Sequence, residues 1–345
     1  MKFHSRRASA LAALVLSGAM FLTACGDDSD SGDGGSDDGG GDATSVTFLP
    51  KNLGNPYFDV TARGGEAAVK EFGGTFDQVG PQEATPDGQV QYINTAAQQG
   101  VNALVISAND PDALCDSIQE ARDAGTKVVT FDSDTNPDCR DLYISQATAE
   151  GIAKTQVDLI AEQIGDEGEI AILSATANAT NQNAWIDMMT ADLEANHPNI
   201  KLVDTVYGDD DDQKSFDQTA ALLQNHPDLK GIVSPTTVGI AAAARYLSDS
   251  AVKGQVKLTG LGFPNELRDY VKDGTIDAFA LWDVEGLGYL AAFTAKALVD
   301  GDIKGDSGDT FDAGKLGSFT VGDDGVVLLG DPTVFNADNI DDYDF

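Results

Sequence analysis

The residues of this chain that are best suited to chemistry are polar and aromatic side chains that follow predicted strands. Aromatic faces suit the C–H side of a sugar ring, whereas carboxylate, amide and ammonium groups suit hydroxyls. Ligands of open α/β sheets bind at the carboxyl ends of the strands, where these side chains fall. The candidate binding residues are Lys51, Tyr57, Phe58, Asp132, Asn181, Gln182, Asn183, Pro235, Thr237 and Trp282.

Three of these candidates have a plainer interpretation when each is taken alone. Phe58 and Trp282 are equally consistent with ordinary core residues, and Lys51 is consistent with a surface lysine. The prediction of a binding site therefore rests on the set of residues and not on any single member.

Motifs that would support catalysis are missing from the sequence. There is no GxxxxGK[ST] phosphate loop, and the near-matches to GxGxxG that start at Gly260 and Gly286 fail at the third glycine. Neither a GxSxG nucleophile elbow nor an HExxH metal helix occurs. His197 and His226 each precede a proline after a helical stretch, so we expect them at surface helix ends. We expect no catalytic residue and no enzyme activity.

Two acidic segments follow predicted strands, and one of them is similar to the start of a calcium loop. The stretch from Asp132 to Asn136 begins like a calcium loop, but Pro137 stands where glycine is needed and Tyr143 where the bidentate Glu belongs. The run 209–212 consists of four Asp residues after a predicted strand, and a solvated loop is the simpler interpretation. We therefore expect neither a metal nor a cofactor.

The charge balance excludes one class of partner. The 345 residues include 57 Asp and Glu against 21 Lys and Arg, a formal net charge of −36. A surface this negative repels phosphates, so we expect no nucleic-acid binding. Hydrophobic residues make up 41% of the chain, enough for a packed core in one large or two medium domains.

The N-terminus has the features of an export signal. Basic residues precede an apolar run in residues 1–24, and this run is too short to span a bilayer. Leu22-Thr-Ala-Cys25 is similar to a bacterial lipoprotein signal, which implies lipidation of Cys25 and a membrane anchor on the extracytoplasmic face. Ordinary cleavage to a secreted protein is the alternative. Residues 25–44, rich in Asp and Gly, are expected to form a flexible tether.

Cys115 and Cys139 remain once Cys25 is assigned to the lipid. An even number of cysteines in an exported chain predicts a disulfide between them. The bridge would close a loop of about 25 residues and stabilise the fold by roughly 3 kcal/mol in the chain-entropy model.

Short apolar runs alternate with helical periodicity from Val46 onward, which is typical of parallel strands joined by helices. Asn55 and Asp110, each before a proline, are expected to cap helices, and a long helix is expected over 284–299. The predicted strands are 46–49, 75–79, 103–107, 127–132, 142–145, 169–174, 201–207, 231–234, 257–260 and 278–282, with shorter candidates at 319–321 and 326–329.

Several segments together resemble the sugar-type periplasmic binding proteins of ABC importers. They are FLPKNLGNPYF (48–58), SANDPDAL (107–114), TNQNAW (180–185) and FALWD (279–283), and the resemblance runs to VFNADNI at 334–340. It is strongest to the branch that binds rhamnose or autoinducer-2. Cys115 and Cys139 also match a cysteine pair of the autoinducer-2 receptor.

The resemblance implies an α/β fold of two Rossmann-like lobes, with parallel sheets joined by a hinge, that close on a ligand. It implies an N-terminal lobe of 45–146 plus about 284–318 and a C-terminal lobe of 147–283 plus about 319–345. The expected order of events is that Lys51, Phe58 and Asp132 receive the ligand, and closure then brings in the second lobe.

The ligand contacts that the resemblance implies are Lys51, Asp132, Asn181 with Gln182, and Pro235 with Thr237. The autoinducer-2 pattern has Asp in place of Asn181 and Ala in place of Thr237, whereas the rhamnose pattern matches both residues. The implied ligand is therefore L-rhamnose or a related monosaccharide, with autoinducer-2 as the alternative.

The implied partners are a small-molecule sugar, a membrane permease with a separate ATPase, and the membrane itself through the lipid anchor. We expect a monomer. Delivery of the closed form to a membrane sensor is an alternative to import. A sugar-responsive repressor with the same two lobes is not expected, because an export signal stands where the DNA-binding helices would be.

Overall fold

Strands and helices alternate through residues 43–345, the part of the chain that the computed structural model describes. All twelve predicted strands and the long predicted helix are present, with ends that differ by at most two residues. The predicted signal and lipidated Cys25 lie outside the described residues.

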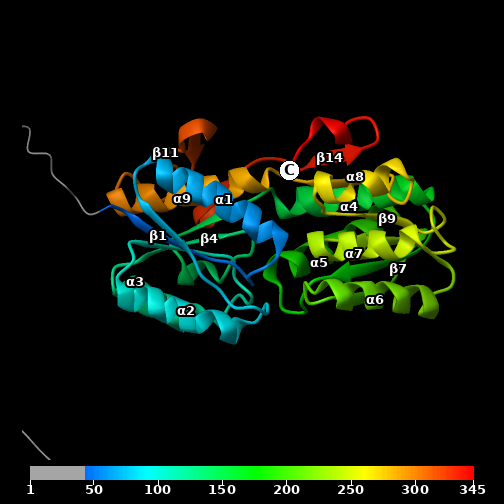
Figure 1. Ribbon diagram of the computed structural model, residues 1–345, viewed down its shortest axis with the longest axis horizontal. Helices are drawn as coiled ribbons and strands as arrows, with labels where there is room; N and C mark the ends of the chain where they lie inside the picture. Colours follow the sequence, from blue (N-terminus) through cyan, green and yellow to red (C-terminus); the bar gives the residue numbers. More distant parts are fainter. Residues whose placement is uncertain (1–42) are drawn as a thin grey trace, which may run out of the picture. The chain divides into compact units, whose positions relative to one another are not determined.

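The first sheet has six parallel strands in the order β13-β5-β4-β3-β1-β2. Helices α1 and α9 cover one face, and α2 and α3 the other (Figure 1). The strands are β1 (Ser45–Leu49), β2 (Thr75–Gln78), β3 (Ala103–Ile106), β4 (Lys127–Phe131), β5 (Leu142–Ser145) and β13 (Val326–Leu328). The helices are α1 (Pro56–Glu71), α2 (Pro86–Gln99), α3 (Cys115–Asp123) and α9 (Val284–Asp300).

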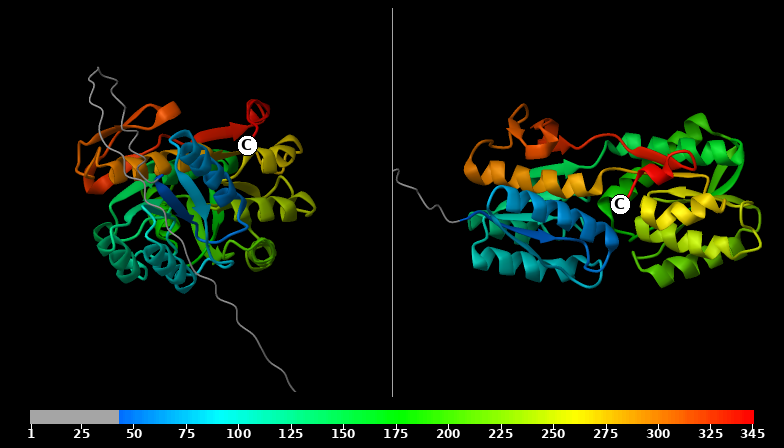
Figure 2. Two further views of the ribbon diagram at one scale, coloured as in Figure 1. Left: turned by 60° about the vertical axis from the view of Figure 1, so that its left-hand side comes forward. Right: turned by 45° about the horizontal axis from the view of Figure 1, so that its top comes forward.

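The second sheet has four parallel strands in the order β7-β6-β8-β9. The strands are β6 (Gly168–Ser174), β7 (Ile200–Tyr207), β8 (Leu229–Ser234) and β9 (Lys257–Gly260). The helices that pack on it are α4 (Ala149–Ile164), α5 (Thr180–Asn196), α6 (Asp212–Asn225) and α7 (Thr237–Ser248), with α8 (Pro264–Lys272) against α7. The second sheet and its helices form the other half seen in Figure 2.

Two antiparallel pairs complete the described fold. β10 (Ala278–Leu281) pairs with β14 (Thr333–Asn336) and touches β9 through a bridge between Leu261 and Ala280. β11 (Thr310–Asp312) and β12 (Ser318–Thr320) form a hairpin. β11 and β14 were not predicted from the sequence.

The chain crosses between the two lobes three times within the described residues. The crossings follow β5, β10 and β13, at residues 146–148, 282–283 and 329–332. Residues from about 319 were expected in the C-terminal lobe. Instead, β13 pairs in parallel with β5 of the first sheet, and only the later β14 joins β10. A three-residue strand carries no pattern that identifies its partner, so the sequence misplaced it.

Local signals decide where the helices begin. Asn55 caps α1 as expected, because its side-chain oxygen accepts a hydrogen bond from the Tyr57 amide at 3.0 Å. The expectation for Asp110 was wrong, since α3 begins only at Cys115. Asp110 Oδ1 accepts from the amides of Asp112 and Ala113, which stabilises a turn ahead of the helix.

The predicted disulfide is present and joins the start of α3 to a short 3₁₀ turn at Pro137–Cys139. The Cα atoms of Cys115 and Cys139 are 5.2 Å apart. This bridge fixes the loop that follows β4, whose first residue is Asp132.

Helices α1 and α9 cross at very close range. A Cβ atom on Gly64 would overlap the carbonyl of Glu285, and one on Gly288 would overlap the carbonyl of Thr61. Glycines that weaken a helix in isolation are therefore needed here, because they let two backbones touch.

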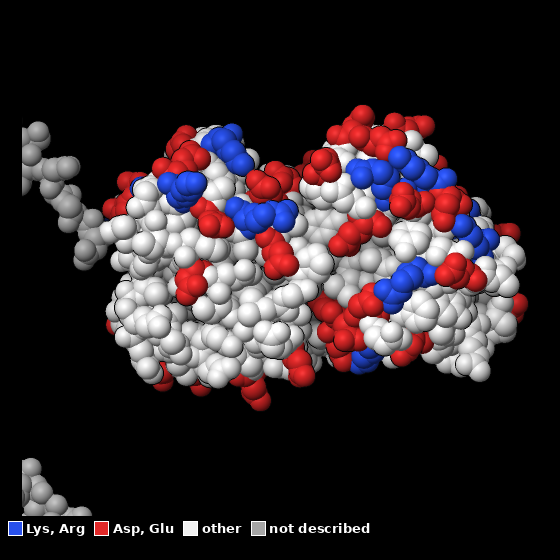
Figure 3. All heavy atoms as spheres, in the orientation of Figure 1, with Lys and Arg blue, Asp and Glu red and all other residues white. Residues whose placement is uncertain are grey.

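The visible surface carries many Asp and Glu side chains, and most Lys and Arg side chains lie beside them (Figure 3). Pairs such as Lys257 with Asp277 and Arg245 with Asp212 are largely exposed, so each contributes little to stability. Among the described residues, no helix combines the length and apolar character required to cross a membrane.

Candidate ligand-binding site

A cavity lies between the two sheets, where strands from both end. Its free volume is about 30 Å³. The residues that line it are Lys51, Asn55, Tyr57, Phe58, Asp132, Asn181, Gln182, Trp185, Asp210, Pro235, Thr236, Thr237, Leu261, Leu281 and Trp282. Nine of the ten predicted site residues are therefore brought together from distant parts of the chain.

Asp132 follows β4 and has a left-handed backbone, with φ of 60°. This conformation is unfavourable for a residue with a Cβ, and such strain is concentrated at functional sites. The Asp132 carboxylate accepts a hydrogen bond from Ser107 Oγ at 2.8 Å, and the Tyr143 hydroxyl donates to the Asp132 carbonyl at 3.0 Å. Both contacts hold the carboxylate in place at the cavity wall.

Three polar side chains link the two lobes across the cavity. Lys51 Nζ lies 3.7 Å from the Asp132 carboxylate and donates to Asn181 Oδ1 at 3.2 Å. Asn181 Nδ2 donates to Asp132 Oδ1, also at 3.2 Å. Since Lys51 and Asp132 belong to the first lobe and Asn181 to the second, the structure is a closed form with its polar groups paired across the gap.

Aromatic side chains form a continuous group on another wall. Trp282 Nε1 donates to the Tyr57 hydroxyl at 3.0 Å, and Tyr57 packs edge-on against both Phe58 and Trp282. Burial raises the pKa of Tyr57 well above its usual value, so its hydroxyl stays neutral. Trp282 stands at a lobe crossing, and Trp185 of α5 packs against it. The wall thus presents neutral, apolar faces with one shared polar edge.

Gln182 has an unused hydrogen-bonding atom at the cavity. Its Nε2 donates to the carbonyl of Pro235 at 3.2 Å, while its Oε1 is buried and accepts from no group among the described residues. Gln182 as a whole is only 5% exposed. A buried oxygen without a hydrogen-bond donor lowers the stability of the fold, and a ligand hydroxyl that donates to Gln182 Oε1 would remove this cost.

Asp210 is a cavity residue that the sequence interpretation missed. The four-Asp run was expected to be a solvated loop, and three members are exposed, but Asp210 is partly buried and lines the cavity. Its Oδ1 accepts from the Thr236 hydroxyl at 2.5 Å. Burial raises the pKa of Asp210, although nearby Lys51 opposes the shift. Nothing in a run of identical residues distinguishes the one that points inward.

The remaining differences between prediction and structure are small. Asn183 does not line the cavity, and its Nδ2 donates to the Ala177 carbonyl within the loop before α5. Trp185 does line it, one helical turn after Gln182, a position that the spacing of three residues could have indicated. Asn55 lines the cavity as well as capping α1.

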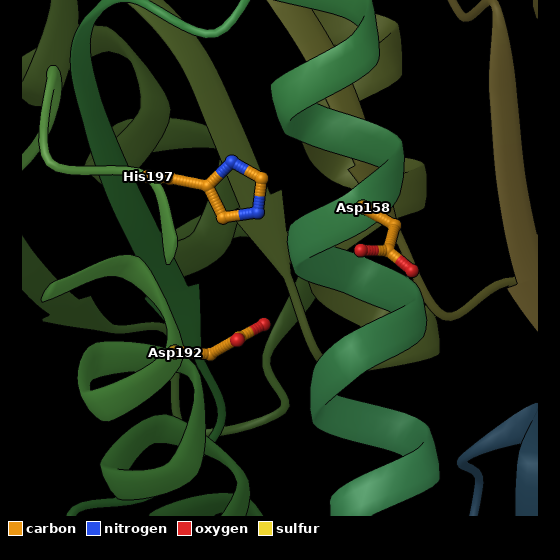
Figure 4. A group of neighbouring side chains, drawn as sticks. All are labelled: Asp158, Asp192 and His197. Carbon is orange, nitrogen blue, oxygen red and sulfur yellow. The ribbon is translucent and has the colours of Figure 1, made fainter. Parts of the chain in front are cut away.

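His197 and His226 both follow the last residues of helices, as expected. Figure 4 shows His197 beside Asp158 and Asp192, with potential ligand atoms within 4.8 Å of one another. Each of the three already has a partner in Lys154, Asn196 or Asp166. The group is therefore explained as a network of polar contacts on the second lobe, outside the cavity.

Comparison with known proteins agrees with this architecture. Residues 46–303 match the family described as "Periplasmic binding protein domain". The chain is 57% identical to a sugar ABC transporter from Actinomyces odontolyticus whose crystal structure covers 88% of this chain and 98% of its own, with a TM-score of 0.71.

Two further structures were solved with ligands. An ABC transporter solute-binding protein from Clostridium phytofermentas with bound L-rhamnose is 37% identical, with a TM-score of 0.85 over 87% of this chain and 98% of its own. LsrB from Clostridium saccharobutylicum in complex with AI-2 is 28% identical, with a TM-score of 0.82 over 87% and 100%.

The family match spans most of the chain, and two relatives exceed 30% identity over nearly all of its folded part. The two-lobed α/β fold is also that of the family. This chain belongs to the periplasmic binding proteins, among the solute-binding proteins of sugar ABC transporters, and is a binding protein and not an enzyme.

Proposed function

We propose that this protein binds L-rhamnose, or a closely related neutral monosaccharide, in the cavity between its lobes and delivers it to a membrane permease. The single observation that carries the proposal is the buried, unpartnered Oε1 of Gln182 at a cavity wall of aromatic rings. A sugar hydroxyl donates to such an oxygen, and the apolar face of the ring packs on the aromatic wall.

The charge of the cavity favours a neutral ligand. Lys51 and Asp132 compensate each other at 3.7 Å, and burial raises the pKa of the Asp210 carboxyl. An anionic ligand would need a free cation, and Lys51, the lysine of the lining, already faces Asp132. Neutral amides, a hydroxyl and a paired carboxylate instead match the donors and acceptors of a sugar.

L-rhamnose is preferred to other sugars on two grounds. Asn181 and Thr237 follow the rhamnose-type pattern, and the relative that carries L-rhamnose is 37% identical to this chain. Asn181 supplies both a donor and an acceptor, whereas an Asp there would only accept. That difference changes which hydroxyl arrangement is satisfied.

Autoinducer-2 is the second candidate ligand. It is favoured by the similarity to LsrB, which was solved with AI-2, and by the shared set of Lys51, Asp132, Gln182 and Pro235. The observation against autoinducer-2 is that this chain has the amide of Asn181 where the autoinducer-2 pattern has an Asp carboxylate.

Calorimetric titration of the protein with L-rhamnose, other deoxy sugars, pentoses, polyols and autoinducer-2 tests the proposal. L-rhamnose is expected to bind most tightly. If it gives no heat while autoinducer-2 binds at micromolar concentration, the ranking is wrong, and if no sugar binds, the proposed function itself fails.

We further propose that Cys25 carries the lipid and that residues 25–44 tether the lobes to the extracytoplasmic face of the membrane. A Cys25→Ser variant is expected to leave the membrane fraction for the medium. A variant that stays with the membrane would remove Cys25 as the anchor.

A further inference from the structure

A second cavity of about 180 Å³ lies next to the first, at the crossing between β5 and α4. We call it the hinge chamber. It is lined by Asp134, Tyr143, Ser145, Gln146, Ala147, Ala149, Thr180, Asn181, Ala184 and Trp185. Asn181 and Trp185 line both cavities, so these two side chains stand between them.

Gln146 is the least satisfied side chain of the hinge chamber. It is 1% exposed, and neither its Oε1 nor its Nε2 has a hydrogen-bond partner among the described residues. Thr180 Oγ1, also at the chamber, is buried and unpartnered as well. A buried amide with both ends unpaired is unfavourable in an apolar setting, and buried polar groups normally have hydrogen-bond partners.

The other polar groups around the chamber are already paired. Arg140 holds Asp134 through two contacts of 2.8 Å, and the Tyr143 hydroxyl donates to the Asp132 carbonyl. Ser145 Oγ donates to the Ala147 carbonyl. The Gln146 amide and the Thr180 hydroxyl are the chamber groups without a hydrogen-bond partner among the described residues. Both are neutral, so they suit an uncharged ligand group that can donate and accept hydrogen bonds.

The first cavity has the smaller free volume of the two, about 30 Å³. The hinge chamber offers 180 Å³ immediately behind Asn181. Asn181 lines both cavities, and its contacts across the lobes, with Lys51 and Asp132, are ones that a hydroxylated ligand can replace.

We propose that the ligand site extends past Asn181 into the hinge chamber, and that Gln146 is a specificity-determining residue that hydrogen-bonds a hydroxyl of the bound monosaccharide. The amide offers both a donor and an acceptor, and either end can bond a sugar hydroxyl. Because Gln146 lies in a lobe crossing, this contact forms where the lobes hinge. The inference rests on the proposed function, since it concerns the same neutral sugar.

Titration of the full-length protein and of Gln146→Leu with L-rhamnose and its 2-, 3- and 4-deoxy derivatives tests the inference. Gln146→Leu is expected to weaken L-rhamnose binding at least tenfold. For one deoxy sugar, the one that lacks the contacted hydroxyl, wild type and variant are expected to bind within about twofold of each other, because the interaction is already absent.

Two further variants keep the test decisive. Gln163→Leu, which removes a partly buried amide of α4 outside both cavities, is the matched control and should bind as the wild type does. Thr180→Ala probes the same chamber if Gln146→Leu melts at a lower temperature than the control, and it should also weaken binding.

Equal binding of all sugars by wild type and Gln146→Leu would overturn the inference and leave the proposed function intact, with the chamber holding only water. An equal loss of affinity for every sugar in Gln146→Leu would also overturn the inference. That result would mean that Gln146 supports the hinge and contacts no sugar hydroxyl. If the calorimetric titrations show that another sugar binds in place of L-rhamnose, the same comparison of wild type and Gln146→Leu is made with the deoxy derivatives of that sugar. Binding of no sugar would defeat both proposals.

Discussion

The hydrogen bonds of single side chains in the cavity indicate what each can do for a ligand. Asp132 is buried, strained at φ of 60° and held by Ser107, so its carboxylate is fixed before any ligand arrives. Preorganised groups of this kind lose little entropy on binding. Gln182 differs from Asp132, because its Nε2 is held by the Pro235 carbonyl while its Oε1 has no donor among the described residues.

Replacement of Asp132 by Ala is expected to weaken sugar binding by about a hundredfold or more, because a charged, buried acceptor is lost and Lys51 is left unpaired. Calorimetry measures the affinity and circular dichroism the fold. Asp158→Ala, which removes the same charge from an exposed site on α4, is the control. Wild-type affinity in Asp132→Ala would remove that residue from the site.

Asp210 gives a prediction for pH. Burial raises the pKa of its carboxyl in the folded protein, with Asp132 and Asp209 adding to the shift and Lys51 opposing it. The folded state therefore holds its proton more tightly than the unfolded state. The stability that Asp210 contributes is full below the unfolded pKa of about 3.9 and is lost as the pH rises from there through the folded pKa.

Comparison of wild type with Asp210→Asn isolates this effect from the charge of the whole protein. Between pH 4 and pH 7 the wild type should lose melting temperature relative to the variant. A constant difference between the two melting temperatures would contradict the raised pKa.

At the scale of helices and strands, most cavity residues lie where parallel strands end and the next helices begin. Each cavity residue follows a strand at its carboxyl end or opens the next helix, so the pattern of strands and helices located most of the site. What the sequence could not show is side-chain direction within a uniform segment, as for Asp210 in its acidic run and Asn183 beside Gln182. It also could not place β13, because three residues carry no partner signal.

The contact between α1 and α9 depends on glycine. Gly288→Ala should destabilise the protein by roughly 1–3 kcal/mol, because the new methyl group overlaps the Thr61 carbonyl of a packed neighbour. Chemical denaturation measures the change. Glu66→Ala on the exposed face of α1 should shift stability by less than about 0.5 kcal/mol. Equal effects of the two substitutions would mean that the helices do not approach this closely.

The disulfide stabilises the loop between α3 and the 3₁₀ turn after β4. Reduction should lower the free energy of unfolding by roughly 3 kcal/mol, and the melting temperature with it. A Cys115→Ser/Cys139→Ser double variant should show the lower value with no further response to reductant. Alkylation of both thiols in the untreated protein would refute the bridge.

At the scale of the whole described fold, the two lobes touch through polar side chains that a sugar would have to displace. Lys51, Asp132 and Asn181 satisfy one another across the gap between the lobes. On the proposed function, sugar binding exchanges one set of hydrogen bonds for another, and we expect the lobes to close on the sugar as a hinge. No bond of the sugar changes in this account, so release returns it unaltered.

The crystal structure of the protein with L-rhamnose tests this claim most directly. The account predicts an intact sugar between the lobes, in contact with Asp132 and with Oε1 of Gln182, and with Asn181 no longer bonded to Lys51. A sugar bound elsewhere, or one between the lobes that touches neither Asp132 nor Gln182, would contradict it.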